Sequence, residues 1–229
     1  FRSYESKSGE RGIFSREASK KVAKRNGRRD PEHEFGTNPC SEIILRPYQF
    51  CNLTEVVIRS SDTEASISNK IRIATILGTF QSTMTHFPYL RKIWQKNTEE
   101  ERLLGVSFTG IYDSPIMNDP NDKDLPERLQ RLRQVAIDTN KEWSEKLGIN
   151  QSAAITCVKP SGTVSQLVLS PSGIHPGHDY YYFRRVRSDN KDPLTKHLIN
   201  AGVPNEPDVM KPHATTVFTF PMKIGRAHV

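Results

Sequence analysis

The chain has 229 residues, of which 35% are hydrophobic and 26% are charged, a balance that suits one or two ordinary globular domains. No apolar run is long enough for a transmembrane helix, and the polar, basic start of the chain lacks the apolar core of a signal peptide. The three cysteines are too few to staple a domain of this size, so they favour a reducing, cytoplasmic compartment. The net charge of +7 favours anionic partners such as phosphates without indicating a fold.

The two ends of the chain look cut. The first residue is Phe1 rather than Met, and the chain begins in mid-pattern. The tail 224–229 is typical of a translated sequencing adapter, so we exclude it from fold reasoning. We interpret residues 1–223 as an internal fragment of a longer protein.

The first predicted element is a helix over 16–26. Ser15 is a plausible N-cap and Gly27 stands where a helix C′ glycine belongs. Cations crowd the last turns, where the helix dipole favours them. The basic run 20–29 could also form a nucleic-acid patch. We favour a solvated helix end, because no aromatic residues are interleaved with the cations.

A strand and a helix are expected next. A loop-like run and the short apolar stretch 43–45 precede the β-branched run 51–58, which predicts the strand. The helix is predicted to open at Ser68 or Asn69 and to end at Pro88, and its apolar stripe is expected to form core. The stripe consists of Ile73, Ile76, Leu77, Phe80, Met84 and Phe87.

The second half of the chain alternates strands and helices. The run 98–101 predicts a capping box ahead of a brief helix, and the run 104–110 predicts a buried strand with close backbone approach at its glycines. A long helix is expected from Pro126 to Gly148. The remaining expected elements are strands at 155–158, 180–187 and 215–220, a turn at 159–165 and a helix at 193–201. This alternation predicts an α/β fold with a mainly parallel sheet or barrel, although the sequence alone does not close the barrel.

The densest cluster of reactive groups is Asn38, Cys40, Glu42 and Cys51. In an extended loop the first three are spaced so that their side chains share one side of the backbone. Such a trio can grip vicinal hydroxyls, because an amide both donates and accepts hydrogen bonds and a carboxylate accepts a proton. Cys51 adds a second thiol, which permits redox exchange with a partner. By spacing alone, structural cysteines explain the two thiols equally well.

The second cluster is the turn Lys159-Pro160-Ser161-Gly162-Thr163, which follows a predicted strand. Small residues at such a turn expose backbone N–H groups that can hold phosphate. The pattern of a Walker A loop is absent. Because short turns of this kind occur in many proteins, the indication depends on its combination with the first cluster.

Together these segments resemble the catalytic subunit of ribonucleotide reductases, most closely the monomeric adenosylcobalamin-dependent (class II) ribonucleoside-triphosphate reductases. The segments that carry the resemblance are 8–14, 38–43, 51–53, 159–165 and 181–187. Each is unspecific alone, but the ordered set is specific and extends from about residue 8 to residue 223.

The resemblance implies a role for each residue of the two clusters. Cys40 matches the cysteine that becomes a thiyl radical and removes the ribose 3′ hydrogen, and Glu42 matches the carboxylate that takes the 3′-hydroxyl proton. Asn38 matches the amide that hydrogen-bonds the sugar. Cys51 matches one half of the dithiol that reduces the 2′ carbon and ends as a disulfide, and its partner is expected upstream of Phe1. The turn that holds the substrate phosphates is matched by Pro160, Ser161, Gly162 and Thr163.

The same resemblance implies a fold, a cofactor and partners. Residues 1–223 are expected to form a central-to-late part of the family's ten-stranded α/β barrel, with Cys40 at the tip of a catalytic finger loop. The implied cofactor is adenosylcobalamin, the substrate a ribonucleoside triphosphate, and the reductant thioredoxin or a similar dithiol. An allosteric deoxynucleotide, a monomeric state, and neither a membrane nor a stable nucleic-acid partner are also implied. Ser41 stands where many relatives have glycine, and the fragment alone is expected to be inactive.

Two alternatives stay open. The large subunit of a class I ribonucleotide reductase would need a separate radical-generating protein. The eleven-residue spacing of Cys40 and Cys51 and the glycine at 162 favour class II instead. A non-catalytic phosphate- or nucleic-acid-binding module would explain the basic charge and the turn, but not Asn38, Glu42 and the two cysteines.

Four further groups of residues have plain structural interpretations. Cys157 is expected to be a buried small hydrophobe. His175 and His178 flank a turn and lack further ligands, so no metal site is predicted. The tyrosines 180–182 are interpreted as strand residues. The cations Arg184, Arg185 and Arg187 face either phosphate or carboxylate, and the sequence does not decide between them.

Overall fold

The computed structural model describes residues 2–7 and 12–223. The tail 224–229 and part of the family-like run 8–14 therefore lie outside the described residues. The chain divides after Ile174 into two compact units, which are described separately below. In the described part of the chain, no helix is both long enough and apolar enough to cross a membrane.

The first unit is built on a parallel pair of strands. Strand β3 (Asn52–Val57) pairs with β4 (Leu104–Thr109), in register from Asn52 opposite Leu104 to Val57 opposite Thr109. The predicted strand at 155–158 is reduced to a single parallel bridge between Val106 and Thr156 on the other side of β4. The α/β organisation predicted for this part of the chain is confirmed.

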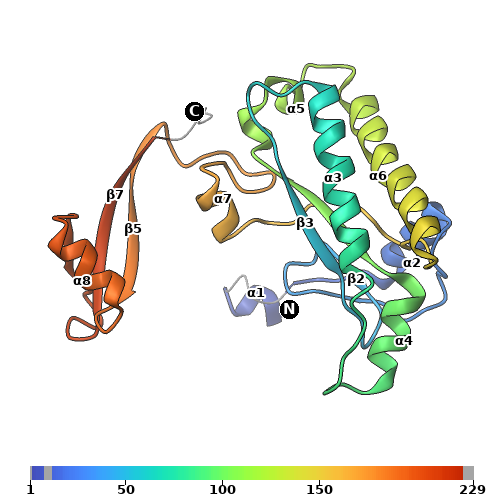
Figure 1. The fold of residues 1–229 in the computed structure, drawn as a ribbon, viewed down its shortest axis with the longest axis horizontal. Helices are drawn as coiled ribbons and strands as arrows, with labels where there is room; N and C mark the ends of the chain where they lie inside the picture. Colours follow the sequence, from blue (N-terminus) through green and yellow to red (C-terminus); the bar gives the residue numbers. More distant parts are fainter. Residues whose placement is uncertain (1, 8–11, 224–229) are drawn as a thin grey trace. The chain divides into compact units, whose positions relative to one another are not determined.

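Two long helices cover one face of this sheet. Helices α3 (Glu64–Gln81) and α6 (Leu125–Leu147) run side by side against β3 and β4 (Figure 1). Because side chains alternate along a strand, one set of β3 and β4 residues meets the helices and the other set faces away from them. The apolar core between helices and strands is formed by Val56, Ile58, Ile67, Ile71, Ala74, Leu104, Val106, Met117, Leu132, Ala136 and Ile155.

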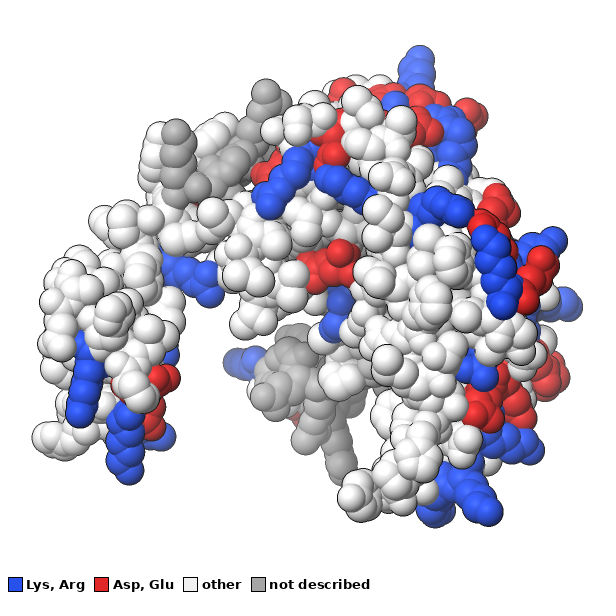
Figure 2. Space-filling view, viewed as in Figure 1, with Lys and Arg blue, Asp and Glu red and all other residues white. Residues whose placement is uncertain are grey.

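The core stripe predicted for α3 is wrong. The helix begins earlier than expected, with Thr63 rather than Ser68 or Asn69 as its N-cap, and it ends at Gln81 rather than at Pro88. Its buried face instead contains Ile67, Ile71, Ala74, Thr75, Gly78 and Thr79. Exposed positions include Ile73, Leu77, Phe80 and Met84. The outer surface of α3 is accordingly almost free of charge in the space-filling view, while charges of both signs border it (Figure 2).

Polar side chains hold α3 against α6 where apolar ones were expected. Asn140 of α6 donates to the hydroxyls of Thr79 (3.0 Å) and Ser152 (2.9 Å). The Thr79 hydroxyl donates to the backbone of Thr75 (2.8 Å). These bonds satisfy Asn140 and Thr79 where the two helices meet, whereas the buried hydroxyls of Thr75 and Ser144 have no partner among the described residues.

Helix α4 (Lys92–Glu101) also departs from prediction. The run 98–101 is not a capping box ahead of a helix but the last turn of α4, and Arg102 ends the helix in the left-handed region, at φ 41°. The reason is tertiary, because Glu101 is buried in an ion pair with Arg29. Two short helical turns, η1 (Ile111–Asp113) and α5 (Pro115–Asn118), follow β4.

Three predicted helix ends are found. Helix α2 (Arg16–Asn26) begins at Ser15, whose hydroxyl accepts from the Ala18 N–H, and ends at Gly27 in the left-handed region. Helix α6 ends at Gly148, also in the left-handed region. These local signals are reliable because a side-chain cap or a glycine with positive φ satisfies the helix terminus without tertiary help. The remaining helices of this unit are α1 (Arg2–Glu5) and α7 (Thr163–Leu167).

The second unit is antiparallel, against the prediction of a mainly parallel sheet. Its strands β5 (Tyr181–Asp189), β7 (Thr215–Lys223) and β6 (Asn205–Pro207) pair in that order, and α8 (Pro193–Asn200) connects β5 to β6. Two of the three β5 arginines have identified acidic partners. Arg185 pairs with Glu206, and Arg187 pairs with Asp208 at 2.7 Å. Both therefore face carboxylates.

Candidate active site

A hairpin presents the first cluster of predicted site residues. Strands β1 (Gly36–Thr37) and β2 (Ile44–Leu45) pair antiparallel, and the segment 36–45 is called the hairpin below. Asn38 organises its tip: its N–H donates to the Ile43 carbonyl (3.2 Å), its carbonyl accepts from Ser41 (3.0 Å) and its side-chain oxygen accepts from the Ile43 N–H (3.0 Å). The tip leaves Cys40 exposed.

Glu42 is the buried carboxylate of this tip, with a side chain that is 6% exposed. Its Oε1 atom accepts a hydrogen bond from the Asn38 amide (2.5 Å) and lies 3.1 Å from the ammonium of Lys159. Its Oε2 atom is buried and has no hydrogen-bond partner among the described residues. One oxygen is thus fixed by two donors, and the other is left to accept a proton or a hydrogen bond.

Lys159 joins the two predicted clusters, which are more than a hundred residues apart in the sequence. Besides the Glu42 carboxylate, its ammonium hydrogen-bonds the Cys40 thiol. Burial works against the charge, but the hydrogen bonds to Glu42 and Cys40 outweigh it and raise the pKa of Lys159. The sequence analysis assigns Lys159 no role of its own. The only local signal was its place directly before the turn.

A buried ion pair anchors the base of the hairpin. The Arg29 guanidinium makes a two-pronged contact with Glu101 (2.9 and 2.8 Å) and also donates to the Ile44 carbonyl (2.7 Å). Gln49 completes the network, accepting from Arg29 (3.1 Å) and donating to Glu101. The side chains of Arg29 and Glu101 are only 5% and 7% exposed. The network connects β2 to the end of α4 and so fixes where the hairpin stands.

Two further thiols lie on the sheet face that the helices leave open. Gly105 of β4 stands opposite Leu53, and the place of a Cβ at Gly105 would be 3.3 Å from the Cys51 sulfur and 3.1 Å from the Cys157 sulfur. The absence of a side chain at Gly105 therefore makes room for both thiols. All three cysteines are free thiols.

The surroundings of Cys51 and Cys157 keep both thiols protonated. Burial raises the pKa of Cys51 to about 12, and Cys157 and Glu42 add to this against the opposing charge of Arg29. Burial and Glu42 likewise raise the pKa of Cys157 to about 11. A thiol of this kind is a poor nucleophile at neutral pH but keeps its hydrogen available.

Cys157 corrects the sequence analysis, which expects a buried core residue. The side chain is half-buried and borders a cavity of about 160 Å³, together with Glu42, Ile43 and Leu104. A usable signal was present, because Cys157 and Lys159 have the same parity in an extended segment and so point to the same side.

The predicted phosphate turn follows directly on Lys159. The Ser161 N–H donates to the Ser172 hydroxyl (2.7 Å), and the Ser161 hydroxyl accepts from the Ser165 N–H (2.9 Å). The Ser161 N–H, one of the donors expected for phosphate, is thus engaged within the turn. Gly162 and Thr163 are exposed at the start of α7.

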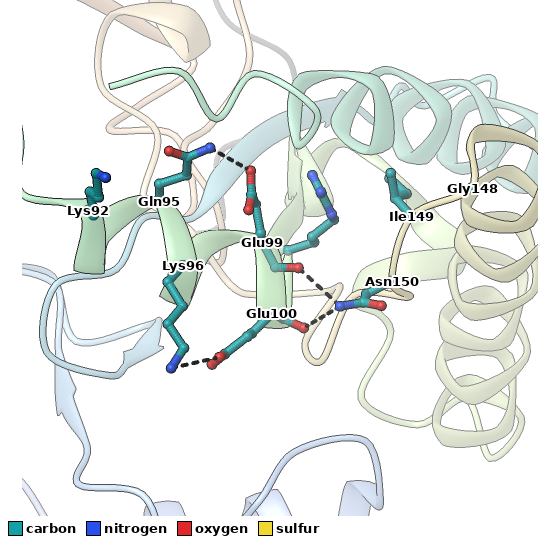
Figure 3. A pocket seen from close by; sticks show the side chains of 9 residues that line it. Lys92, Gln95, Lys96, Glu99, Glu100, Gly148, Ile149 and Asn150 are labelled. Atoms are coloured by element: carbon teal, nitrogen blue, oxygen red, sulfur yellow. Dashed lines mark hydrogen bonds and ion pairs between the residues drawn. The ribbon is translucent and has the colours of Figure 1, made fainter. Parts of the chain in front are cut away.

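A larger hollow elsewhere on the first unit does not belong to this site. It has a volume of about 410 Å³ and lies between α4 and the loop after α6 (Figure 3). Its polar groups bind one another: the Asn150 amide donates to the Glu99 carbonyl (3.2 Å), and Lys96 pairs with Glu100 (3.8 Å).

Among the described residues, no group of three or more His, Cys, Asp or Glu side chains is placed to hold a metal ion.

The geometry brings together part of the predicted site. Cys40 and Glu42 meet at Lys159, and Asn38 holds the Glu42 carboxylate. Cys51 lies beside Cys157 at the Gly105 space, where the charge of Glu42 helps to raise its pKa. An accessible thiol beside a half-engaged carboxylate, with a protonated thiol nearby, suits thiol chemistry on a hydroxylated substrate.

Comparisons with known proteins identify relatives of this chain. The chain is 30% identical over 96% of its length to the adenosylcobalamin-dependent ribonucleoside-triphosphate reductase of Lactobacillus gasseri, and 28% identical over 96% to that of Euglena gracilis. A crystal structure of a B12-dependent (class II) ribonucleotide reductase superposes with a TM-score of 0.67 at 27% identity, covering 82% of this chain and 29% of that one. No family model matches the chain.

The resemblance to the ribonucleotide reductases is therefore confirmed. The chain spans about a third of the length of the curated relatives it matches, 32% for the L. gasseri enzyme and 30% for the E. gracilis enzyme.

Proposed function

We propose that the protein carrying this chain reduces ribonucleotides, as triphosphates, to 2′-deoxyribonucleotides by a cysteine thiyl radical. One observation carries the proposal: Cys40 and Glu42 converge on Lys159, the residue before the Pro160–Thr163 turn. A sugar held at the thiol and the carboxylate would have its phosphates within reach of that turn. The names of the relatives, ribonucleoside-triphosphate reductases, support the same substrate class.

The hairpin tip supplies the groups that act on the 3′ position. Cys40, as a thiyl radical, removes the 3′ hydrogen, and the exposed tip gives its sulfur access to a sugar. Glu42 accepts the 3′-hydroxyl proton at Oε2, the oxygen without a partner. Asn38 holds Oε1 through its amide, and a small rotation of the same amide offers a hydrogen bond to the sugar.

Cys51 supplies reducing hydrogen to the 2′ carbon. Its raised pKa, about 12, means that it enters the reaction as a thiol rather than a thiolate. Loss of the 2′ hydroxyl as water takes two electrons and two hydrogens from a dithiol, which becomes a disulfide. We assign one half of that dithiol to Cys51 and place its partner upstream of this chain.

Adenosylcobalamin is the proposed cofactor, as in the relatives' names. When bound, it supplies the radical that the amino acids cannot generate. The residues present fit this role in one respect: the Cys40 thiol is exposed at a hairpin tip and so accessible to a radical source outside the hairpin. The open sheet face that carries Cys51 and Gly105 fits the interior of the family's ten-stranded barrel, with the hairpin as its finger loop.

The turn is proposed to bind the substrate phosphates. The first N–H groups of a helix have no partner inside that helix, so Thr163 and Val164 can donate to an anion. Ser161 would have to exchange its hydrogen bond to Ser172 for one to phosphate. The proposal therefore includes a local rearrangement of the turn on binding.

The remaining partners follow from the same proposal. We propose thioredoxin or a similar dithiol as reductant, an allosteric deoxynucleotide, a monomeric enzyme and a cytoplasmic location. The three free cysteines support a reducing compartment.

Both alternatives have less support. A nucleic-acid-binding module needs unpaired cations gathered on one face, but Arg72, Arg128 and Arg131 are paired with acidic residues. Lys and Arg are interspersed with Asp and Glu on the visible surface (Figure 2). A class I large subunit shares the thiyl chemistry, but the curated relatives named above are adenosylcobalamin-dependent.

The test is an assay of the full-length protein that contains this chain. Ribonucleoside triphosphates and diphosphates are offered with a dithiol reductant, with and without adenosylcobalamin, and deoxynucleotide is measured. Product only with the cofactor, and more from triphosphates, is the expected result. Product only after addition of a radical-generating subunit would move the protein to class I. Absence of product under every condition would overturn the proposed function.

A further inference from the structure

Lys159 has a position that its neighbours in the turn do not share. Its ammonium lies between the Glu42 carboxylate, at 3.1 Å, and the Cys40 thiol. The Lys159 side chain is 25% exposed and that of Glu42 only 6%, so the ion pair is largely screened from solvent. Ion pairs in such surroundings hold a fixed geometry better than those on an open surface.

The backbone at Lys159 is fixed as well. The Lys159 carbonyl lies 3.2 Å from the place of a Cβ at Gly173, whose φ is +52°. Two residues later, the Ser161 N–H donates to the Ser172 hydroxyl, and this hydroxyl donates to the Ser161 carbonyl, both at 2.7 Å. Before substrate binds, the segment that carries the ammonium is therefore held against 172–173, and the bond from the Ser172 hydroxyl to the Ser161 carbonyl does not depend on the Ser161 N–H that we propose for phosphate.

The contacts divide the two oxygens of Glu42 into different roles. Oε1 is engaged by Asn38 and Lys159, whereas Oε2 is buried without a partner in the part of the chain that the structure describes. A carboxylate fixed in this way can rotate only by breaking both contacts. The oxygen left for proton transfer is thus selected by the ammonium and the amide together.

We propose that Lys159 is a positioning residue for the reaction: it holds the Glu42 carboxylate with Oε2 free for the 3′-hydroxyl proton, and it keeps the Cys40 sulfur beside that carboxylate. As a donor, the ammonium contacts a lone pair of the sulfur, which leaves the S–H hydrogen free to be removed. The inference rests on the proposed function, whose 3′ chemistry needs thiol and base at one carbon.

Other charged and titratable groups near Glu42 define what a pH experiment reports. Cys51 and Cys157 act on Glu42 electrostatically, and Arg29 acts on Cys51 from the hairpin base. Both thiols stay neutral below about pH 10, given their raised pKa values. Between pH 5 and 9, Lys159 is therefore the cation in direct contact with the Glu42 carboxylate.

The experiment uses three variants of the full-length protein. Lys159→Gln removes the charge, Lys159→Arg retains it, and Lys146→Gln is the matched control, because Lys146 forms an exposed ion pair with Glu142 on α6. The measurements are kcat and KM for a ribonucleoside triphosphate between pH 5 and 9, the Kd of the nucleotide, and the melting temperature.

For Lys159→Gln we expect kcat to fall by about ten- to a hundredfold, a part of the effect of a positioned general base. The acid limb of the pH–rate profile moves to higher pH, because a carboxylate without its cation ionises less readily. Nucleotide Kd stays within about threefold, Lys159→Arg recovers part of the rate, and the control matches the unmodified protein. A raised Kd with unchanged kcat would make Lys159 a phosphate ligand instead and overturn the inference.

A second measurement separates this inference from the proposed function. In the full-length protein labelled with ¹³C-carboxyl glutamate, the Glu42 signal is assigned by its loss in Glu42→Gln and its chemical shift is measured by NMR at one pH. Because the Lys159 ammonium lies 3.1 Å from Glu42 Oε1, we expect the signal to shift in Lys159→Gln and not in Lys146→Gln. An unshifted signal would overturn the inference whatever the enzyme assay shows, whereas a shifted signal in a protein without reductase activity would overturn only the proposed function.

Discussion

The base and the tip of the hairpin are built in opposite ways. The base is closed: Arg29 and Glu101 pair away from solvent, and Arg29 also binds the Ile44 carbonyl. The tip is open: Cys40 is exposed, and Ser41 beside it adopts φ 67°, a conformation that disfavours a side chain. The position of the Cys40 thiol is therefore set by the buried ion pair at the base, while the thiol itself stays exposed.

The sharpest contrast is expected in thiol reactivity. With a pKa of about 12, Cys51 is a thiolate only about one part in 10⁴ at pH 8. Its alkylation by iodoacetamide should be at least about 10³-fold slower than that of a cysteine peptide, whereas exposed Cys40 should be modified first. Mass spectrometry of timed samples from pH 7 to 11 gives both rates. Equal rates for Cys40 and Cys51 in the folded chain, rather than only in urea, would contradict the contrast.

The next largest effect is expected from breaking the ion pair at the base of the hairpin. Glu101→Gln leaves the buried Arg29 charge without its partner, and such a change destabilises by about 3–5 kcal/mol. The free energy of unfolding in urea measures it. The control is Glu142→Gln, which removes an exposed pair with Arg72 and should cost less than about 1 kcal/mol. Similar losses for the two variants would show that the base does not anchor the hairpin.

The space that Gly105 leaves for the Cys51 and Cys157 sulfurs is tested by adding a side chain there. In Gly105→Ala the new Cβ would stand 2.5 Å from a Leu53 methyl and 3.1 Å from the Cys157 sulfur, so we expect a loss of about 1–3 kcal/mol. Gly78→Ala in α3 is the matched control, since its nearest contacts would be 3.5 Å and alanine favours a helix by about 0.5–1 kcal/mol. Stabilisation by both substitutions would mean that the two thiols need no such space.

The smallest effect is expected at the tip itself. Ser41→Gly relieves the positive φ, 67°, and should stabilise the chain by about 0.5–1 kcal/mol, after the added freedom of glycine in the unfolded chain. Ser60, exposed in a turn and without a positive φ, is the control, and Ser60→Gly should destabilise slightly. Thermal unfolding compares the two. The opposite order would mean that the positive φ of Ser41 does not strain the tip.

Local signals in the sequence predict the fold where a few neighbouring residues decide it. Ser15 and Gly27 bound α2, and Gly148 ends α6, because caps and left-handed glycines act over one turn. The α3 stripe was wrong for a tertiary reason. Thr79 and Asn140 satisfy one another across the α3–α6 seam, so a polar face is buried and Leu77 is left exposed.

The candidate site also has one part that the local sequence predicts and another that it does not. Asn38, Cys40 and Glu42 were predictable as a group because they are close in the sequence, but the extended loop expected for them is wrong: the Ser41 N–H donates to the Asn38 carbonyl in a turn, which leaves Cys40 exposed and Glu42 buried. The shared parity of Cys157 and Lys159 indicates that their side chains point to the same side, but it does not show what they meet. Their contacts with Glu42 and the Gly105 space join segments far apart in the sequence, and only the family resemblance connected the two clusters.

We propose that Cys40 carries the radical step, and the decisive variant is Cys40→Ser in the full-length protein. Serine keeps the size and hydrogen bonding of the side chain but cannot form a thiyl radical. Nucleotide reduction and nucleotide binding are measured on the same preparation, with adenosylcobalamin and a dithiol present. We expect reduction to disappear while the Kd of the nucleotide changes by less than about threefold. Substantial remaining reduction would show that Cys40 does not carry this step.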